Sequence, residues 1–514
     1  MKKIFCLMMM CWAQALAYAQ DYQKVFEAIH AEGKSNGDLP QMAHELLDKI
    51  GPRLVGSPQM QMAHDYVVNQ YRQWGIEAYN EQWGEWRSWT RGFTHVDMMA
   101  PWQKSLEAVQ LAWNPNMKRA VEAEVVLLPF AEDSAAFAKL LPGLKGKFVA
   151  IAQPLSSGRP LKTYTPFIGE DGTDSVAKLR QQETAAWQKR LAHTGYDMRG
   201  LVQALEAAGA AGILQCSWTG GWGVLKVFAA RTQHIPHVEL GVEDYNLLVR
   251  LSENGSKPKL RIHTTSHWGP MVPTYNTMAV MKGAERADEI VLLSAHLDSW
   301  DAGTGATDNG TGVLTMMEAM RILKKVYPNP RRTIMVGHWG SEEQGLNGSR
   351  SFTEDHPELL DKISMVFNQD NGTGRINTIA TQGYLHAYAF FEKWKHYLPA
   401  RLQQQSWQLT YPGVPGVGGS DNIAFITRKV PAFYLASSRD WDYRTYTWHT
   451  QRDTYDKIVF EDLQDNAILV ACLVYMACEE AEPLSRETIT LPIDAKTGKP
   501  MEWPGPGKAK RTGP

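Results

Sequence analysis

From about residue 274 onward, unbroken apolar runs alternate with segments whose apolar residues repeat at helical spacing. The runs are EIVLLSA (289–295), TIMVGHW (333–339), ISMVFNQ (363–369) and PAFYLAS, which follows Val430. Such runs are typical of parallel strands covered on both faces. Helical patterns fall between and after them, at 312–326, around 345–360 and at 460–480. The alternation predicts the α/β fold class, with a three-layer αβα domain around a mostly parallel central sheet.

The segment before this domain carries two other patterns. Residues 22–50 have helical patterning, and a second helix is predicted to begin at Ser57 as N-cap, with Pro58 in its first turn, and to end at Gly75. Residues 80–118 alternate in polarity and are rich in tryptophan, which predicts strands. We expect these elements to pack with the later strand–helix units.

Between about 120 and 265 the elements are shorter. KGKFVAIAQ has a strand pattern, VQALEAAGAAGILQCS predicts a helix, a glycine turn and a strand, and IPHVELGVEDYNLLVRL predicts a strand followed by a helix. The polar stretch 155–200 lies among them and predicts a loop with a helix. Because this segment concentrates no chemically useful side chains, it is interpreted as a scaffold or a lid.

Length, charge and cysteine content narrow the class of protein. The chain has 514 residues, enough for two or three domains. Its formal net charge of −2 argues against a nucleic-acid partner, which normally requires a basic surface. Beyond the N-terminus only Cys216, Cys472 and Cys478 remain, and this odd, sparse set excludes a disulfide scaffold or a cysteine-rich metal site. We expect three buried free thiols.

The first residues have the pattern of a secretory signal peptide. Lys2 and Lys3 precede the apolar run IFCLMMMCWAQAL, and Ala17-Tyr18-Ala19 supplies the small residues of a cleavage site. This run and every later one are shorter than the roughly 20 apolar residues that span a bilayer. The sequence therefore predicts export, cleavage near Ala19, and a periplasmic or secreted protein without a membrane span.

Potential metal ligands follow three of the predicted strands. His296 ends the first strand, Glu342 and Glu343 follow the second, and Asp370 ends the third. Because ligands collect at the carboxyl ends of strands in open α/β sheets, these side chains should meet at one rim. His449, which follows the strand PAFYLAS, is the best candidate for a second histidine ligand.

The residue types indicate divalent-metal chemistry. Histidines and carboxylates without cysteine suit zinc or a similar ion. Two metals need about five protein ligands, including a bridging carboxylate, and one further carboxylate to take a proton from the attacking water. The adjacent pair Glu342 and Glu343 fits this division, since one can bind metal while the other faces the water. Any one of these acids alone would more often be a solvated loop carboxylate.

Several motifs in combination resemble a known family. HLDSWDAGTGATDNGTG, SEEQG, the strand end at Asp370 and HTQRDT are similar to the co-catalytic di-zinc peptidases of the aminopeptidase and transferrin-receptor type. HLDSWD together with GPRLVGS (51–57) is especially similar to the carboxypeptidase Q branch of that family. The middle segment resembles a protease-associated domain through LKGKFVAI, AAGAAGIL and IPHVEL.

The resemblance implies a site with two zinc ions per chain. His296 and Asp370 would hold one zinc ion, Glu343 and His449 would hold the other, and Asp308 would bridge the two. All five ligand positions are intact, so the chain does not resemble the metal-free receptor members of the family.

The resemblance also assigns residues around the ligands. Glu342 would be the general base and then the acid that protonates the leaving amine. Asp298 would hydrogen-bond the imidazole of His296 and fix its tautomer. The peptide after Asp308 is expected to be cis. His338, inside its strand, is expected to be a buried structural histidine.

Candidate substrate residues lie later in the chain. Ser420 and Asp421 occupy the loop YPGVPGVGGSDNIAF, where the family has a loop on the substrate side or behind the ligands. Arg439 and Arg444 lie near the second histidine ligand and could meet a substrate carboxylate, although isolated surface arginines usually do not. Asp301 has no ligand role that we can assign, and we expect it to cap its loop.

The resemblance implies a zinc exopeptidase acting on short peptides or dipeptides, by attack of a hydroxide that the two metals bridge. Cleavage polarity stays open between aminopeptidase, carboxypeptidase and dipeptidase. Two alternatives are a non-catalytic peptide-binding protein on the same fold and a single-zinc acyltransferase of the glutaminyl-cyclase type. A homodimer is compatible with the resemblance.

The expected domain organisation follows from these assignments. The divisions are a signal peptide at 1–19, a first part of the peptidase domain at 20–118, an inserted protease-associated-like domain at 119–268, the catalytic domain at 269–485 and an exposed C-terminal tail at 486–514.

Overall fold

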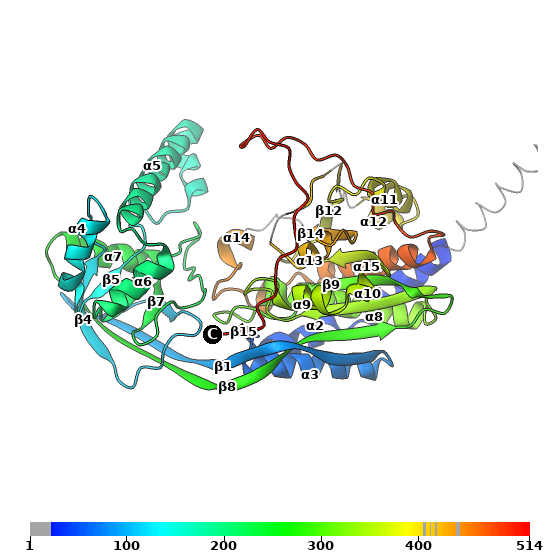
Figure 1. Cartoon of the computed structure of the whole chain (residues 1–514), viewed down its shortest axis with the longest axis horizontal. Coiled ribbons are helices and arrows are strands. Elements are labelled where there is room, and N and C mark those ends of the chain that lie inside the picture. Colours follow the sequence, from blue (N-terminus) through cyan, green and yellow to red (C-terminus); the bar gives the residue numbers. More distant parts are fainter. Residues whose placement is uncertain (1–21, 405–407, 412, 417–418, 438–442) are drawn as a thin grey trace, which may run out of the picture.

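The computed structural model describes residues 22–404, 408–411, 413–416, 419–437 and 443–514. The predicted signal peptide with its cleavage site, and Arg439, lie outside the described residues. Figure 1 shows two lobes joined by a long antiparallel ribbon of β1 (Glu77–Ala100) and β8 (Lys259–Met281). Among the described helices, none has the length and apolar character that crossing a bilayer requires.

The larger lobe is built on a mixed, mostly parallel sheet. The order of its strands is β13-β12-β14-β11-β9-β10-β8. β9, β10, β11 and β14 pair in parallel, whereas β12 is antiparallel to β14 and β8 is antiparallel to β10. The bounds are β9 (Arg286–His296), β10 (Arg332–Trp339), β11 (Ile363–Asn368), β12 (Ile376–Ala380), β13 (Gln408–Thr410) and β14 (Ala432–Ser437).

Alternate residues of β9 face two separate apolar cores. Val291, Leu293 and Ala295 belong to one core, and Ile290 and Leu292 belong to the other. The first core is covered by residues 22–35, α2 (Leu39–Ala43), the following helix His44–Ile50, α3 (Pro58–Gln73), α8 (Thr311–Val326), α11 (Ala387–Lys395), α12 (Ala400–Gln404) and α15 (Phe460–Glu479). The second is covered by α9 (Asn347–Asp355), α10 (Pro357–Leu360) and α13 (Asn422–Ile426). The predicted three-layer α/β fold is therefore confirmed.

The start of α3 agrees with its predicted caps. The Ser57 hydroxyl accepts a hydrogen bond from the Met60 amide at 3.1 Å, which satisfies one of the free N–H groups of the first turn. Pro58 is the first helical residue, and Gly75 follows the helix with φ +71°, a backbone angle that favours glycine.

The smaller lobe contains a second set of strands. β4, β5, β6 and β7 pair in parallel, and β3 adds an antiparallel edge. Their bounds are β3 (Ala108–Gln110), β4 (Val121–Leu127), β5 (Phe148–Ala150), β6 (Gly212–Gln215) and β7 (His237–Leu240). One face packs on α7 (Val242–Glu253), and the other packs on α4 (Ser134–Leu140), α6 (Met198–Ala207) and Trp187 of α5 (Thr165–His193). The stretch expected to hold a loop and a helix contains α5, which projects from this lobe in Figure 1.

The predicted tryptophan-rich strands are mainly the single strand β1, which is followed by β2 (Lys104–Ser105) and β3. β1 pairs with β8 over nearly its whole length, with four register shifts. Three tryptophans of β1 are buried: Trp83, Trp86 and Trp89. They form a cluster with Trp113 and Trp300 at the junction of the lobes. The cluster joins the ribbon to the loop that follows β9.

The C-terminal segment 486–514 is largely exposed, yet it is docked on the larger lobe. The Trp503 indole donates a hydrogen bond to the Ile426 carbonyl at 2.8 Å. The Arg511 guanidinium pairs with the carboxylates of Glu354 and Asp355. β15 (Thr512–Gly513) then pairs in parallel with β1. The predicted tail is therefore an ordered strap rather than a free end.

Candidate active site

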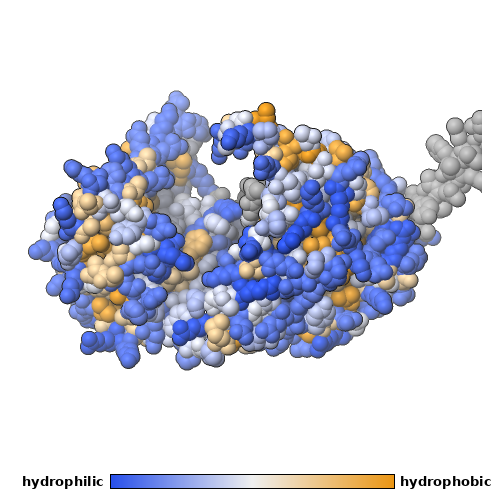
Figure 2. Space-filling view, viewed as in Figure 1, coloured by the Kyte–Doolittle hydropathy of each residue, from blue (hydrophilic) through white to orange (hydrophobic). Residues whose placement is uncertain are grey.

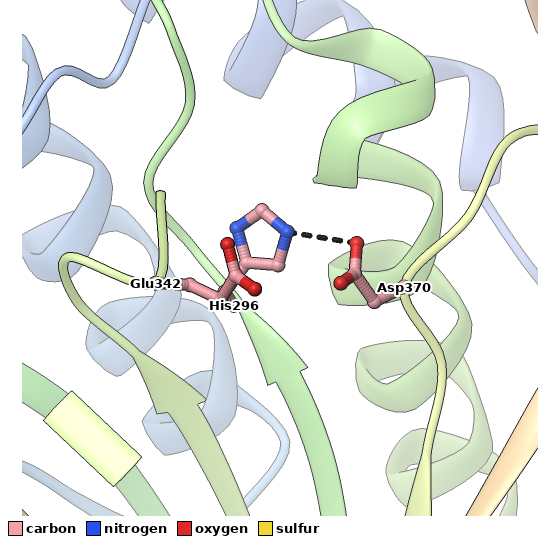
Figure 3. A group of neighbouring side chains, drawn as sticks. All are labelled: His296, Glu342 and Asp370. Atoms are coloured by element: carbon pink, nitrogen blue, oxygen red, sulfur yellow. Dashed lines mark hydrogen bonds and ion pairs between the residues drawn. The ribbon is translucent and has the colours of Figure 1, made fainter. Parts of the chain in front are cut away.

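The residues that follow the strands converge at one rim, as their positions predict. His296 is the last residue of β9, and its Nε2 lies 2.9 Å from Oδ1 of Asp370 (Figure 3). Glu342, in the loop after β10, has a carboxylate oxygen within 4.8 Å of the ligand atoms of both. His296 and Asp370 are buried, so this group is withdrawn from solvent.

A second group, formed by Asp308, Glu343 and His449, lies beside the first. His449 Nε2 is 2.9 Å from Glu343 Oε2 and 3.3 Å from Asp308 Oδ2. The other oxygen of Asp308, Oδ1, lies 3.4 Å from His296 Nε2. One carboxylate therefore faces both histidines, which is the arrangement that a bridging ligand needs. The peptide bond between Asp308 and Asn309 is cis, as expected.

The electrostatics of this cluster suit a pair of divalent cations. Burial raises the pKa of Glu343 to about 7, and it also raises the pKa of Asp370. Burial alone would lower the pKa of His449, but the carboxylates of Glu343 and Asp308 raise it to about 9. The buried Oε1 of Glu343 accepts no hydrogen bond from any described residue. Carboxylates and imidazoles crowded in this way are the oxygen and nitrogen donors that zinc takes without cysteine.

Glu342 differs from its neighbour in where its side chain lies. It belongs with His296 and Asp370, whereas Glu343 belongs with His449 and Asp308. Burial raises the pKa of Glu342 well above its ordinary value, and the nearby carboxylate of Asp370 adds to the increase. A carboxyl group with a raised pKa can both accept and return a proton near neutral pH.

Asp298 connects the loops after β9 and β10. Its Oδ1 accepts a hydrogen bond from the Glu342 amide at 3.0 Å, and its Oδ2 accepts one from the Glu343 amide at 3.3 Å. The ring Nδ1 of His296 lies 3.0 Å from the backbone carbonyl of Asp298 and 3.6 Å from Oδ1. The backbone carbonyl of Asp298, rather than its carboxylate, thus lies at hydrogen-bond distance from the imidazole, and the carboxylate holds the backbone of the glutamate pair.

Two residues that the sequence analysis did not select hold the loop around Asp308. The carboxylate of Asp453 accepts hydrogen bonds from the amides of Thr307 and Asp308, and burial raises its pKa to about 7. The buried Arg53 guanidinium donates to the carbonyls of Leu297, Thr304 and Gly305. Asp453 lies in HTQRDT and Arg53 lies in GPRLVGS, two motifs that carried the family resemblance. The sequence could therefore have indicated both residues as candidates for the site.

The smaller lobe reaches the site through residues 226–228. The Val227 amide donates a hydrogen bond to the His449 carbonyl at 2.8 Å, and Lys226 forms an antiparallel bridge with Thr450. The Phe228 ring lies 5.0 Å from the His449 ring, at an angle of 79°. His449 has φ +61°, an unusual angle for a residue with a side chain, and these contacts hold it there.

The remaining predicted residues fall into two groups. Ser420 and Asp421 are buried; the Ser420 hydroxyl accepts a hydrogen bond from Asn368, and burial raises the pKa of Asp421 to about 7. Arg444, in α14 (Tyr443–Tyr446), is exposed and lies over the ring of Trp448 at 4.4 Å.

The residues predicted to be structural have clear partners. Asp301 pairs with Arg91 of β1 through two contacts, at 2.6 and 2.9 Å, and so anchors its loop to the ribbon. His338 is buried, with its Nε2 2.8 Å from the Tyr71 hydroxyl, which confirms a structural role. Cys472 and Cys478 are buried and Cys216 is partly buried, and all three are free thiols.

Comparison with known proteins assigns part of the chain to a family. Residues 276–474 match the family model described as peptidase family M28. This segment belongs to the M28 peptidases. Mouse carboxypeptidase Q is 24% identical to the chain over 480 residues, which cover 92% of each protein. Rat carboxypeptidase Q is 25% identical over 482 residues, with the same coverage.

Solved structures share the architecture of this chain. The crystal structure of a peptidase M28 precursor from Shewanella amazonensis SB2B has a TM-score of 0.66 and 25% identity, covering 91% of this chain and 99% of that one. A zinc aminopeptidase from Bacillus subtilis, at 16% identity, has a TM-score of 0.58 and shares the fold over 87% of this chain and 96% of its own.

The comparisons confirm the predicted resemblance at the level of family and fold. All of the proposed ligands, together with Glu342 and Asp298, lie within the segment that matches the M28 peptidases. The smaller lobe lies outside that segment, so its relation to protease-associated domains stays a prediction. The domain boundaries and the roles of individual site residues also stay predictions.

Proposed function

We propose that this protein is an exported, zinc-dependent exopeptidase of the M28 type that hydrolyses short peptides. The observation that supports this most strongly is the carboxylate of Asp308, whose two oxygens face His296 and His449 at 3.4 and 3.3 Å. A single-zinc site would have no need of a carboxylate shared between two ligand groups. The shared carboxylate therefore favours hydrolysis over the acyltransferase alternative.

The ligand groups divide between the two ions. His296 and Asp370 would hold one zinc ion, Glu343 and His449 would hold the other, and Asp308 would contact both. When bound, the two ions supply an activated water and stabilise the negative charge that develops on the scissile carbonyl oxygen.

Proton transfer falls to Glu342. Its carboxylate would accept a proton from the attacking water and then deliver it to the leaving amine, so that the carboxyl group is regenerated as a base. Asp298 would position Glu342 by holding the backbone amides of the glutamate pair. His449 would depend on the smaller lobe for its backbone conformation, through Val227.

We also propose where the enzyme acts and how its substrate reaches the site. The N-terminal pattern supports export to the periplasm or the medium, with cleavage near Ala19. The smaller lobe would be a protease-associated domain that covers the site from one side, and Figure 2 shows a hollow in the surface between the two lobes. A homodimer is compatible with this arrangement. Short peptides would enter through the hollow.

The adjacent glutamates provide a matched pair of variants. Glu342→Gln should retain about two equivalents of zinc and lose about 100-fold to 10,000-fold in kcat, because only proton transfer is removed. Glu343→Gln should instead lose zinc, because a ligand is removed. Zinc is measured by plasma mass spectrometry, and turnover is measured on a library of short peptides. If the two variants behave alike, the division of roles is wrong.

The non-catalytic alternative predicts a different pattern. A peptide-binding protein on this fold would bind peptides without releasing products, whether or not zinc was present. A chelator should abolish hydrolysis by the enzyme, and added zinc should restore it. Peptides that remain intact in the presence of zinc would overturn the proposed function.

A further inference from the structure

The smaller lobe contributes one lysine to the edge of the metal centre. Lys226 forms a backbone bridge with Thr450, directly after His449, and only 8% of its surface is exposed. Its ammonium nitrogen lies 3.5 Å from the centre of the Trp448 ring. The Trp448 ring in turn lies 4.2 Å from the His449 ring. The Trp448 ring is thus close both to the lysine and to a proposed zinc ligand.

The ammonium group of Lys226 lies near two aromatic rings, and the buried carboxylates of Glu239 and Asp308 attract it from beyond ion-pair distance. Within the ranges that the structure describes, its ammonium group makes no hydrogen bond and no ion pair. Its nearest charged companion at this ring is another cation, the Arg444 guanidinium, which lies over the Trp448 ring at 4.4 Å. Taking an ammonium group out of water is costly unless an anion or hydrogen-bond acceptor replaces the water. Two cations at one ring repel each other, so a bound anion would stabilise both.

We propose that Lys226, together with Arg444, binds a carboxylate of the substrate beside the metal centre. The inference rests on the proposed function and adds a substrate class to it: peptides that carry a carboxylate close to the bond that is cut. The carboxylate is either the free C-terminus or an acidic side chain, which present the same group to the ammonium. Recognition of the free C-terminus would make the enzyme a carboxypeptidase or dipeptidase.

The placement of Lys226 suits this role. Residues 226–228 reach the larger lobe as a short strand-like segment, so the lysine is held by backbone contacts rather than by a mobile loop tip. Phe228 and Trp448 shield the ammonium group from water on two sides, at 5.6 and 3.5 Å from the ring centres. A charge in such surroundings attracts a carboxylate more strongly than an exposed lysine does.

The test compares Lys226→Met with the wild type on two pairs of peptides. The first pair is a dipeptide as the free acid and as its C-terminal amide. The second is a peptide amide with glutamate or glutamine next to the scissile bond. The wild type should prefer the carboxylate in at least one pair by about 10-fold to 100-fold in kcat/KM. In Lys226→Met this preference should disappear, mainly through a higher KM for the carboxylate peptide.

Two further variants separate charge from structure. Lys226→Arg should keep part of the preference, because it keeps the positive charge. Lys145→Met changes an exposed lysine of the same lobe and should keep the wild-type preference in full. If the preference that Lys226→Met removes is the one in the first pair, the recognised group is the terminal carboxylate. If it is the one in the second pair, the recognised group is the side-chain carboxylate.

Calorimetry supplies a readout that does not need turnover. The same four peptides are titrated into Glu342→Gln and into Glu342→Gln/Lys226→Met, both loaded with zinc. Tighter binding of the carboxylate peptides that depends on Lys226 supports the inference even if hydrolysis fails. The inference would be overturned if the wild type bound and cleaved both members of each pair equally. It would also be overturned if Lys226→Met lowered kcat/KM equally for both members of a pair. Zinc-dependent hydrolysis without carboxylate preference would leave the proposed function intact.

Discussion

The carboxylate of Asp453 accepts a hydrogen bond at 3.0 Å from the backbone amide of Asp308, the residue whose side chain faces both histidines. Asp453 also accepts two hydrogen bonds, both at 2.7 Å, from the amide and hydroxyl of Thr307. It therefore holds the backbone from which the proposed bridging ligand projects. Asp453→Asn replaces one acceptor oxygen with an NH₂ group, which cannot accept the hydrogen bonds made to that oxygen. We expect a loss of zinc affinity of about 10-fold to 100-fold.

The measurement is a competition titration of zinc against a chelator of known affinity. Asp456→Asn is the matched control, because Asp456 lies three residues further on and its side chain is 71% exposed. The control should bind zinc as the wild type does. An Asp453→Asn protein that binds zinc with unchanged affinity would show that the loop around Asp308 needs no such support.

A second prediction concerns the ion pair between Asp301 and Arg91. The two contacts join the loop after β9 to the ribbon strand β1, and both side chains are largely buried, at 6% and 16% exposed. Removing either partner leaves the other charge without compensation. A double-mutant cycle of Asp301→Asn and Arg91→Met should give a coupling free energy of about 1 to 3 kcal/mol in chemical unfolding. Zinc content should not change, since Asp301 contacts none of the ligands.

Some of the proposed ligands were predictable because they lie at the end of a strand that the apolar pattern identifies, or shortly after it. His296 and Asp370 end or follow strands of the sheet, and parallel strands bring their carboxyl ends to one rim. The pairing of Glu343 with His449 and of Glu342 with His296 was not predictable in this way. It depends on side-chain directions in a loop, and spacing along the chain carries no information about them.

Contacts between the lobes were beyond what sequence patterns could predict. Lys226 lies in a segment without periodicity, and its approach to Trp448 depends on how the β1–β8 ribbon bends. The four register shifts along that ribbon also interrupt the period-two pattern. For this reason β1 was expected as several strands, although it is one. The docking of residues 486–514 likewise depends on partners far away in sequence, such as Ile426.

The C-terminal strap should contribute to stability through Trp503. Its indole donates a hydrogen bond to the Ile426 carbonyl, and its ring lies 5.5 Å from that of Tyr384. Trp503→Ala should lower the free energy of unfolding by about 2 kcal/mol, because it removes both apolar contact and the hydrogen bond. Trp503→Phe keeps the apolar contact and should lose about half as much. Unfolding in urea measures both, and equal values for wild type and Trp503→Ala would mean that the strap is not docked in solution.

Buried histidines should make the fold sensitive to acid. Burial lowers the pKa of His338 to about 3, whereas an unfolded chain has a histidine pKa near 6.5. Between these values the unfolded state binds a proton that the folded state does not, so the free energy of unfolding falls as pH decreases below 6.5. At pH 5 the loss from His338 should be about 2 kcal/mol relative to pH 7.5. His338→Gln removes the titrating group and should remove this part of the pH dependence.

The experiment measures urea unfolding of wild type and His338→Gln at a series of pH values from 7.5 to 5. The readout is the slope of the difference between the two proteins, because contributions from other groups, including the proposed zinc ligands, cancel in that difference. A slope that is the same in wild type and His338→Gln would mean that the imidazole takes up a proton inside the fold. The hydrogen bond with Tyr71 would then have to rearrange, because protonated His338 would need an acceptor at both ring nitrogens.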